Sequence, residues 1–298
     1  PNKFDELLLE NKPNHMVGVP SHYGNIIHSK KLKNEDLSYV IAPTVGGDKM
    51  DENLEKETNE FLREHNCEYK VVKGYGMTEV NAAVAACTSN ETNKIGSVGI
   101  PFPNTTISIF DPKTGEELGY NEKGEVCITG PNTMLGYFNN DEETNKILRK
   151  HEDGNVWVHS GDIGYMDADG NLYIVDRLKR MIIRPDGFKI FPSLIEDVVV
   201  KHPSVQSCKA VGLRDFSFSQ GKLPKVHVVL NETDRNPEAI ENEILMLCEE
   251  QLPEYYWPCE IEFNESLPLT PIGKIDYLKL EKEDYEKQLA ATKKLVKK

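Results

Sequence analysis

Two charged residues at the ends of a predicted hairpin have the chemistry to hold a vicinal diol. Ile163–Met166 and Leu172–Val175 are short strand-like runs, and the turn sequence Asp167–Gly170 joins them. Antiparallel pairing of the two runs brings Asp162 and Arg177 to the open end of the hairpin. The carboxylate can accept hydrogen bonds from two hydroxyls of a ribose, and the guanidinium can donate to one. An ordinary surface ion pair is the alternative interpretation.

The hexapeptide GYGMTE has chemistry suited to a base, a phosphate and a metal ion. Gly74 and Gly76 flank Tyr75, so the backbone can come close to a flat ligand while the ring packs on it. Thr78 offers a hydroxyl to a phosphate. Glu79 offers a carboxylate to Mg²⁺, which prefers carboxylates together with substrate phosphates. A chance turn between a strand and a loop is the alternative.

A pair of glycines occupies a position where many α/β proteins bind nucleotides. Gly46, Gly47 and Asp48 follow the apolar run Leu37–Ala42, which we expect to be a buried strand. Asp51 is placed to cap the helix that comes next. A strand, a glycine-bearing loop and a helix in that order present backbone groups to a nucleotide. A plain turn would have the same sequence.

One lysine near the end of the sequence stands in a loop that we expect to be rigid. The stretch Leu267–Asp276 reads LPLTPIGKID, and its two prolines and one glycine restrict the backbone around Lys274. Such a loop can aim an ammonium group at a carboxylate or a phosphate. Considered alone, a solvated surface charge is the commoner role for such a lysine.

The elements that position these residues form three groups along the chain. Residues 1–95 combine strands, loops and helices, as an α/β domain does. In residues 96–178, short strands such as Thr105–Phe110 and Gly124–Thr129 alternate with turns, which predicts a small antiparallel sheet or barrel. Asp141–Lys150 is predicted to be a polar surface helix.

A small α+β domain is predicted from Lys179 onward. Ser193 and Glu196 have the spacing of a capping box, which would open a helix over Leu194–Lys201. The other predicted elements are three strands and an amphipathic helix, at Val205–Leu213, Lys225–Leu230, Cys259–Phe263 and Pro237–Gln251 respectively.

Composition excludes several classes of protein. The chain has 298 residues and a formal net charge of −14, which argues against a nucleic-acid binder because phosphate contacts need a basic face. No window approaches the apolar length of a membrane span, so we expect no membrane insertion. The six cysteines show no CxxC spacing. We expect them to be reduced and mostly buried, in a cytoplasmic protein.

The order of the motifs resembles the adenylate-forming superfamily, which contains acyl- and aryl-CoA synthetases, nonribosomal adenylation domains and luciferases. The motifs that carry the resemblance are GYGMTE at 74–79, GEVCITGPNTMLGYFNN at 124–140, SGD at 160–162, DRLK at 176–179 and TPIGK at 270–274. Together with GYGMTE, the stretch IGSVGIPFPNT at 95–105 favours the fatty acyl-CoA synthetases within that superfamily.

The resemblance implies a reaction in two steps. A carboxylate attacks the α-phosphate of ATP, giving an acyl-adenylate and pyrophosphate, and a thiol, commonly that of coenzyme A, then takes the acyl group. Mg²⁺ is the implied metal, held by Glu79. The implied nucleotide-binding residues are Gly46, Gly47, Asp48, Tyr75, Gly76, Asp162 and Arg177, and the implied catalytic residues are Lys274, Thr78 and Glu79.

The resemblance also implies a domain that moves between the two steps. Lys179 stands where the superfamily has its hinge, so the C-terminal domain would withdraw Lys274 after the first step. A loop that contains Gly187 and Phe188 would then receive the thiol.

The implied fold class is α/β and α+β. Residues 1–95 would be the distal part of a large α/β nucleotide-binding domain, an adenylation subdomain of which the rest is missing. Residues 96–178 would form a small, antiparallel, β-barrel-like subdomain. Residues 179–298 would form a mobile α+β C-terminal domain that carries the catalytic lysine.

Two departures from the superfamily pattern affect the expected activity and the expected thiol. The Ser/Thr/Gly run ending in Pro-Lys-Gly, which binds phosphate in the superfamily, has no counterpart here, so we expect the C-terminal half of a longer enzyme with weak adenylation or none by itself. The segment from Arg177 to Gly187 is one residue longer than usual and contains Pro185 and Asp186. This difference leaves open which thiol is received.

Three functions therefore remain open at this stage. The first is an AMP-forming acyl-CoA synthetase whose acid is a fatty acid, since nothing near Met77 or Val80 supplies a charge for the ammonium of an amino acid. The second is an adenylation enzyme that loads a carrier protein. The third is a non-catalytic module that binds a nucleotide or an acyl-CoA, although such a module would not need both Lys274 and Glu79.

Overall fold

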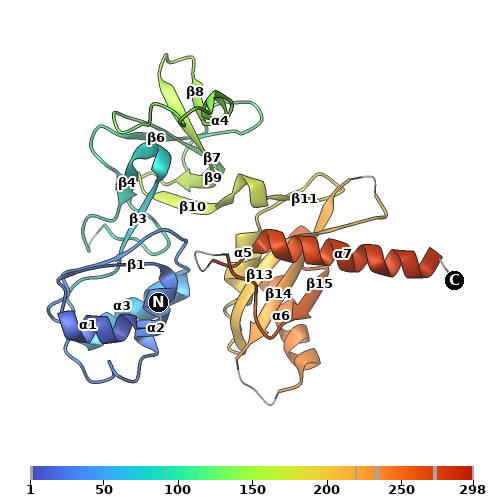
Figure 1. The fold of residues 1–298 in the computed structure, drawn as a ribbon, viewed down its shortest axis with the longest axis horizontal. Coiled ribbons are helices and arrows are strands. Elements are labelled where there is room, and N and C mark those ends of the chain that lie inside the picture. Colours follow the sequence, from blue (N-terminus) through green and yellow to red (C-terminus); the bar gives the residue numbers. More distant parts are fainter. Residues whose placement is uncertain (1–2, 91, 219, 232–234, 271–273, 297–298) are drawn as a thin grey trace. The chain divides into compact units, whose positions relative to one another are not determined.

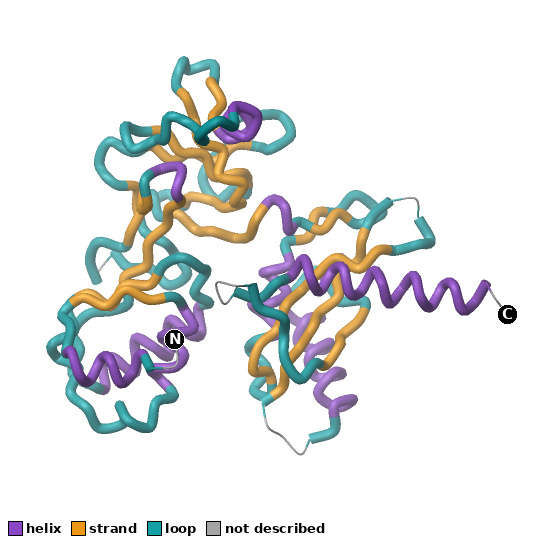
Figure 2. Tube along the Cα trace, in the orientation of Figure 1, coloured by secondary structure: helices purple, strands orange, loops and turns teal. Residues whose placement is uncertain are grey.

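The chain divides into two compact units, Pro1–Ile174 and Val175–Lys298 (Figure 1). Both units mix helices and strands (Figure 2). Each unit has a hydrophobic core of its own. The computed structural model describes residues 3–90, 92–218, 220–231, 235–270 and 274–296.

A five-stranded sheet organises the first half of the first unit, among the residues that the structure describes. In chain order its elements are α1 (Phe4–Asn11), β1 (His15–Gly18), α2 (Pro20–Ile27), β2 (Ala42–Val45), α3 (Glu52–Glu64), β3 (Val72–Met77), β4 (Ala82–Ala86) and β5 (Ile100–Pro101). The strand order is β1-β2-β3-β4-β5, parallel from β1 to β3 and antiparallel from β3 to β5. Apolar side chains of all three helices bury against β1 and β2.

The helix α3 begins where the sequence predicts. Asp51 Oδ1 accepts hydrogen bonds from the backbone N–H groups of Asn53 and Leu54, at 2.9 and 3.0 Å. These two donors have no partner within the helix, so the carboxylate satisfies them. Leu62 is buried, and Leu54 and Phe61 pack against the same core, so the predicted apolar face is confirmed.

Replacing this cap should weaken the fold measurably. We expect Asp51→Ala to lower the free energy of unfolding by about 1 kcal/mol, because two backbone donors lose their acceptor. Urea unfolding followed by circular dichroism measures the effect as a lower midpoint. Asp51→Asn keeps a capping oxygen and should stay close to the wild type. An Ala variant as stable as the Asn variant would show that the cap contributes nothing.

Two strands of this sheet, β2 and β3, were predicted at the wrong positions. Leu37–Ala42 does not form a strand, because the Asp36 carboxylate accepts from the Ser38 N–H at 3.1 Å and bends the chain into a turn. The strand β2 starts only at Ala42. The predicted strand Tyr69–Val72 is displaced in the same direction, and β3 starts at Val72.

A second, antiparallel sheet follows, and its last strand β10 crosses the boundary between the two units. It consists of β6 (Thr106–Phe110), β7 (Gly124–Thr129), β8 (Leu148–Lys150), β9 (Val156–Met166) and β10 (Leu172–Arg177), with the helix α4 (Asp141–Ile147). The order is β10-β9-β7-β6, and β8 pairs with β9. Over the described residues the sheet is open, so of the two predicted forms the structure has a sheet and not a closed barrel. Its apolar face shares one core with β4.

The turn between β9 and β10 has the predicted chemistry. Gly170 has a φ of 83°, a conformation that glycine adopts without strain. The Asp167 carboxylate accepts from the N–H groups of Asp169 and Asn171 at 3.0 and 2.8 Å. Lys94 forms ion pairs with Asp167 at 2.8 Å and Asp169 at 2.7 Å. Burial opposes the charge on Asp167, but the hydrogen bonds from Lys94 and Asn171 hold the pKa of this carboxyl at about 2.

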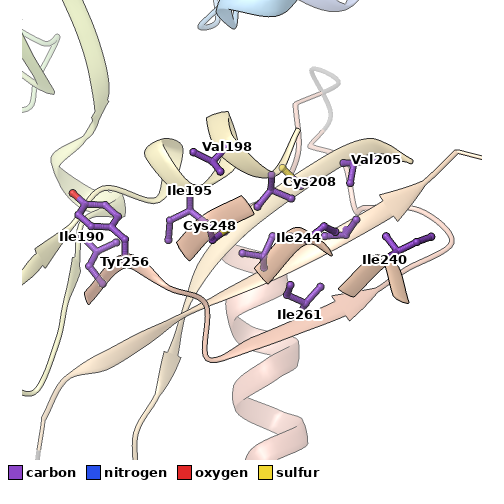
Figure 3. Packing of buried hydrophobic residues seen from close by; sticks show 14 of the residues in the cluster. Ile190, Ile195, Val198, Val205, Cys208, Ile240, Ile244, Cys248, Tyr256 and Ile261 are labelled. Carbon is purple, nitrogen blue, oxygen red and sulfur yellow. The ribbon is translucent and has the colours of Figure 1, made fainter. Parts of the chain in front are cut away.

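The second unit is a three-stranded sheet packed against helices, as far as the structure describes it. The elements are η2 (Leu178–Arg180), β11 (Ile182–Ile183), β12 (Lys189–Ile190), α5 (Pro192–Val199), β13 (Val205–Arg214), β14 (Lys222–Leu230), α6 (Pro237–Gln251), η3 (Glu254–Tyr256), β15 (Glu260–Phe263) and α7 (Tyr277–Val296). Ile195 of α5 and Ile244 of α6 bury against the sheet with Val205 and Ile261 (Figure 3). The predicted helix Pro237–Gln251 is confirmed at both ends.

The central strand β14 has an apolar face and a charged face, and both are buried. Val226 and Val228 belong to the apolar cluster with α5 and α6. Lys225 and His227 alternate with them and contact the Asp284 carboxylate of α7, at 2.7 and 2.8 Å. The helix α7 therefore attaches to the sheet through buried ion pairs. No helix among the described residues is both long enough and apolar enough to cross a membrane.

The predicted capping box at the start of α5 is wrong. The helix begins at Pro192, and its N-cap residue Phe191 makes no side-chain cap. The Ser193 hydroxyl instead donates to the Val175 carbonyl at 2.6 Å. Glu196 accepts from the Arg180 guanidinium at 2.5 Å. Both side chains bind other elements of the unit, so they are unavailable to the helix terminus.

Candidate active site

Three parallel strands bring two of the predicted loops to one edge of the first sheet. Because β1, β2 and β3 run in the same direction, their carboxyl ends lie at the same edge. Gly46, Gly47 and Asp48 follow β2 directly, and Thr78 and Glu79 follow β3 in the short turn η1 (Thr78–Val80). Ligands of open α/β sheets bind at such an edge.

The backbone of the loop after β2 is open to a ligand. The Gly46 N–H donates to the Gly18 carbonyl at 3.0 Å, which fastens the loop to the end of β1. A Cβ atom added to Gly46 would meet no heavy atom within 4 Å. Gly47 has a φ of 77°, so another residue would be strained there. A flat group could therefore approach this backbone closely, as the nucleotide assignment requires.

The structure joins Tyr75 to Asp162, two of the residues predicted to bind a nucleotide. The Tyr75 hydroxyl donates to Asp162 Oδ2 at 2.7 Å, although the two residues are 87 positions apart. Asp162 lies in β9, and its N–H donates to Ser160 Oγ at 3.0 Å. Ser160 in turn donates to the Val126 carbonyl at 2.6 Å. These bonds fix the direction of a carboxylate next to an aromatic ring.

Position 76 requires a glycine for a structural reason that the sequence did not reveal. A Cβ atom at this position would lie 1.7 Å from the carbonyl oxygen of Ala82 in the neighbouring strand β4. The close approach of β3 to β4 therefore excludes any other residue. This requirement is independent of the predicted approach of a ligand to the same backbone.

Glu79 has a partner that sequence reasoning missed. The Tyr137 hydroxyl donates to Glu79 Oε1 at 2.5 Å, and the Met134 N–H donates to the Glu79 carbonyl at 2.8 Å. The hydrogen bond to Glu79, with burial, raises the pKa of Tyr137 to about 12. Tyr137 belongs to the stretch GEVCITGPNTMLGYFNN, for which the sequence analysis proposed no site residue.

The donor set around Glu79 fits a divalent cation. Within the described part of the chain, no lysine, arginine or histidine forms an ion pair with Glu79. An oriented carboxylate without a cationic partner is the kind of ligand that Mg²⁺ takes together with substrate phosphates. The hydroxyl of Thr78, which precedes it, is exposed.

Removing the Tyr137 hydroxyl tests this arrangement. We expect Tyr137→Phe to raise the Mg²⁺ concentration that gives half-maximal exchange about tenfold, because Glu79 loses the donor that orients it. The measurement is the Mg²⁺ dependence of pyrophosphate exchange, made on a version of the chain extended upstream if this chain alone shows no exchange. Tyr120→Phe removes a hydroxyl from a tyrosine that is 64% exposed and serves as the control. An unchanged Mg²⁺ dependence in Tyr137→Phe would contradict the role of this tyrosine.

In the second unit, the segment predicted to be the hinge ends at a partly buried arginine, Arg180. Arg177 and Lys179 are exposed, whereas Asp176 is buried. Arg180 donates to Asp176 at 3.1 Å and to Glu196 at 2.5 Å. The two carboxylates hold the pKa of the Arg180 guanidinium above its usual value in spite of burial. The turn η2 is thus anchored to α5 directly after Lys179.

The loop predicted to receive the thiol is a tight turn with an exposed aromatic ring. The Gly187 N–H donates to the Arg184 carbonyl at 3.0 Å, and Gly187 has a φ of 87°. Pro185 occupies the second position of this turn, where its fixed φ is favourable. Asp186 forms an ion pair with Arg184 at 3.0 Å. Phe188 stacks on Tyr255 with ring centroids 4.6 Å apart and is 50% exposed.

Lys274 lies at the closed end of its loop. The Thr270 N–H donates to the Lys274 carbonyl at 2.7 Å, and the Lys274 N–H donates to Thr270 Oγ1 at 3.1 Å. An isolated bridge between Leu269 and Ile275 continues this pairing. The predicted rigidity from Pro271 and Gly273 concerns positions outside the described residues.

The predicted site residues are divided between the two units. Gly46, Gly47, Asp48, Tyr75, Gly76, Thr78, Glu79 and Asp162 belong to the first unit, whereas Arg177, Lys179, Gly187, Phe188 and Lys274 belong to the second. The proximity of Asp162 to Arg177 therefore stays a prediction. Shape alone does not locate the site, since a hollow of about 370 Å³ lies between α2 and α3 and contains none of these residues.

The first unit has the form of a nucleotide-binding α/β domain, with glycine loops and a fixed carboxylate at the end of a parallel sheet. The chain belongs to the AMP-binding enzyme family. The pattern of that family matches residues 1–138, and the pattern of the AMP-binding enzyme C-terminal domain matches residues 194–274. The predicted membership of the adenylate-forming superfamily is thereby confirmed.

Similarities to known sequences and structures are consistent with this family. A long-chain-fatty-acid–CoA ligase of Bacillus subtilis is 33% identical over 289 residues, which are 95% of this chain and 49% of the relative. A 4-coumarate–CoA ligase of Narcissus pseudonarcissus is 33% identical over 86% of this chain and 45% of its own length. The ATP-bound crystal structure of MatB from Rhodopseudomonas palustris matches with a TM-score of 0.82 and 25% identity, over 94% of this chain and 53% of that one. The chain thus spans about half the length of the relatives it matches.

Proposed function

We propose that this chain is the C-terminal half of an AMP-forming acyl-CoA synthetase. The observation that carries the proposal is the hydrogen bond between Tyr75 and Asp162, beside the loops at the carboxyl ends of β2 and β3. The bond joins an aromatic ring to a carboxylate, which are the two groups that would contact the adenine and the ribose of a bound adenosine. The likeness to CoA ligases supports the same function.

Each predicted nucleotide-binding or metal-binding group has a chemical task in this proposal. Tyr75 and the Gly46–Asp48 loop hold the adenine of ATP, and Asp162 holds the ribose with Arg177. Thr78 donates its hydroxyl to a phosphate oxygen. Mg²⁺, held by Glu79, would neutralise charge on the phosphates of ATP.

Lys274 supplies the charge that the first step requires. The attacking carboxylate and the α-phosphate are both anionic, so their approach is opposed electrostatically. The Lys274 ammonium would lie between them and offset the charge that develops during the attack. The acid displaces pyrophosphate, and the thiol of coenzyme A then displaces AMP at the loop of Gly187 and Phe188. We place the hinge for this change at Lys179.

We propose a fatty acid as the carboxylic acid and coenzyme A as the thiol. The fatty-acid ligase among the relatives supports the first choice, and the matching CoA ligases support the second. Loading of a carrier protein is the alternative for the thiol, because Pro185 and Asp186 lengthen the loop that would receive it.

Exposed apolar side chains support the proposal that a further half completes the enzyme. Leu135 and Phe138 are 101% and 93% exposed, and they flank Tyr137, the partner of Glu79. Val17 of the edge strand β1 is 76% exposed. Burying large apolar side chains is favourable, so a domain that carries the phosphate-binding loop would gain stability by covering any of these side chains.

Carboxylate-dependent ATP–pyrophosphate exchange tests the function. The assay compares this chain with a version extended upstream, over short, long-chain and aromatic acids. We expect exchange only in the extended version and the highest rates with long-chain acids. Exchange in neither version would favour a non-catalytic module that binds a nucleotide or an acyl-CoA.

A further inference from the structure

A buried group of three different metal-ligating side chains joins the strands β7 and β9. Glu125 and Cys127 are two positions apart on β7, so they project from the same face of the strand. His159 of β9 is the direct cross-strand partner of Cys127. One ligand atom from each of these residues lies within 4.8 Å of the other two. Their exposed fractions are 5%, 0% and 7%.

The distances in this group are close to those around a tetrahedral zinc ion. Cys127 Sγ lies 3.5 Å from His159 Nδ1, and about 3.6 Å follows from tetrahedral Zn–S and Zn–N bonds of about 2.3 and 2.0–2.1 Å. His159 Nδ1 lies 2.8 Å from Glu125 Oε2. This second separation needs to widen by about half an ångström to admit the ion.

Neighbouring groups already orient the donors. The Gly161 N–H donates to Glu125 Oε1 at 3.0 Å, which leaves Oε2 facing His159. His151 Nε2 lies 2.9 Å from His159 Nε2 on the other side of the ring. With a metal on Nδ1, the proton of His159 would be on Nε2 and would be donated to His151. Metal-binding histidines usually have such a partner for the second ring nitrogen.

A second group of potential ligands in the chain shows what excludes a metal. His227, Glu262 and Asp284 also lie within reach of one another. The ammonium of Lys225 stands among them, 2.7 Å from both carboxylates. That group therefore has its own cation. No lysine or arginine among the described residues forms an ion pair with Glu125, and the side chain that its carboxylate contacts is His159.

We propose that Glu125, Cys127 and His159 form a binding site for a zinc-like divalent cation. The mixed sulfur, nitrogen and oxygen donors suit Zn²⁺ or Co²⁺ rather than Mg²⁺. On binding, the Cys127 thiol loses its proton to solvent and forms the metal–sulfur bond, while His159 binds through Nδ1 and has its proton on Nε2.

The site would fasten β7 to β9 three residues before Asp162. It requires neither ATP nor the upstream half, because all three ligands belong to one sheet of the first unit. The site is therefore independent of the proposed enzymatic function, and so is its test. A metal that binds only the folded chain also stabilises it, increasingly as its concentration rises.

Co²⁺ reports directly on the thiolate. The chain is refolded from urea with Co²⁺, because the donors are buried. We expect one Co²⁺ per chain, with a thiolate-to-cobalt charge-transfer band in the near ultraviolet. Cys127→Ala should lose the band. Cys67→Ala, which removes another buried thiol of the same unit, should keep it. Absence of the band from the wild type, or its persistence in Cys127→Ala, would overturn the proposal.

A measurement on the wild type alone covers the case in which Cys127→Ala does not fold. Thermal unfolding is followed with increasing Zn²⁺ and again after chelation. We expect the midpoint to rise with Zn²⁺ and to return with the chelator. A midpoint that does not respond to Zn²⁺ would reject the site.

Discussion

Lys274→Ala should lower the rate of acyl-adenylate formation at least about a hundredfold in a chain that includes the upstream half. The expected loss is large because the lysine would offset charge that exists only as the two anions approach. Its position supports this role, since the hydrogen bonds between Thr270 and Lys274 hold the ends of the loop together. The measurement is pyrophosphate exchange with a long-chain acid under saturating ATP.

The second step separates this role from a general defect. Transfer to coenzyme A from a preformed acyl-adenylate should be largely spared, because the hinge at Lys179 would have withdrawn Lys274 by then. Lys279→Ala removes an exposed lysine at the start of α7 and should affect neither step. Equal loss of both steps in Lys274→Ala would mean that the residue supports the domain and not the first reaction.

Local chemistry explains which elements could be predicted from the sequence. The turn at Gly170 and the cap at Asp51 depend on a few adjacent residues, and both are confirmed. The helix α6 starts at Pro237 and ends at Gln251 as predicted, because its apolar residues repeat at a helical period. These features need no knowledge of the rest of the fold.

Two of the wrong predictions have a common physical cause, which is competition from side chains. The apolar run after Asp36 looked like a strand, but the Asp36 carboxylate binds the Ser38 N–H and turns the chain. Ser193 and Glu196 had the spacing of a capping box, yet they bind Val175 and Arg180. In both places a polar side chain had several possible partners, and the sequence did not say which one it would take.

Contacts between distant residues account for what sequence reasoning missed at the site. Tyr137 and Glu79 are 58 positions apart, and a phenol that binds a carboxylate has no sequence period. The pairing of Tyr75 with Asp162 was equally invisible, although motif likeness had selected both residues. The motifs thus identified residues with matching chemistry, and the sheets determined which of them touch.

Asp162→Ala should weaken the binding of AMP more than about tenfold, because a carboxylate that accepts from two ribose hydroxyls contributes about 1.5–3 kcal/mol for each charged hydrogen bond. A surface ion pair would contribute at most about 1 kcal/mol, or roughly a fivefold change. The sizes of the two effects therefore distinguish the two interpretations of this residue. Calorimetric titration with AMP gives the dissociation constant.

Two further variants show whether the carboxylate itself is responsible. Tyr75→Phe keeps the aromatic ring and removes the hydroxyl that donates to Asp162, so we expect a smaller loss of affinity. Asp169→Ala removes an acid at the other end of the same hairpin, 76% exposed, and should leave AMP binding unchanged. If Asp162→Ala binds AMP as tightly as Asp169→Ala does, the ribose assignment is wrong. The hydrogen bond from Tyr75 would then serve only to join the strands β3 and β9.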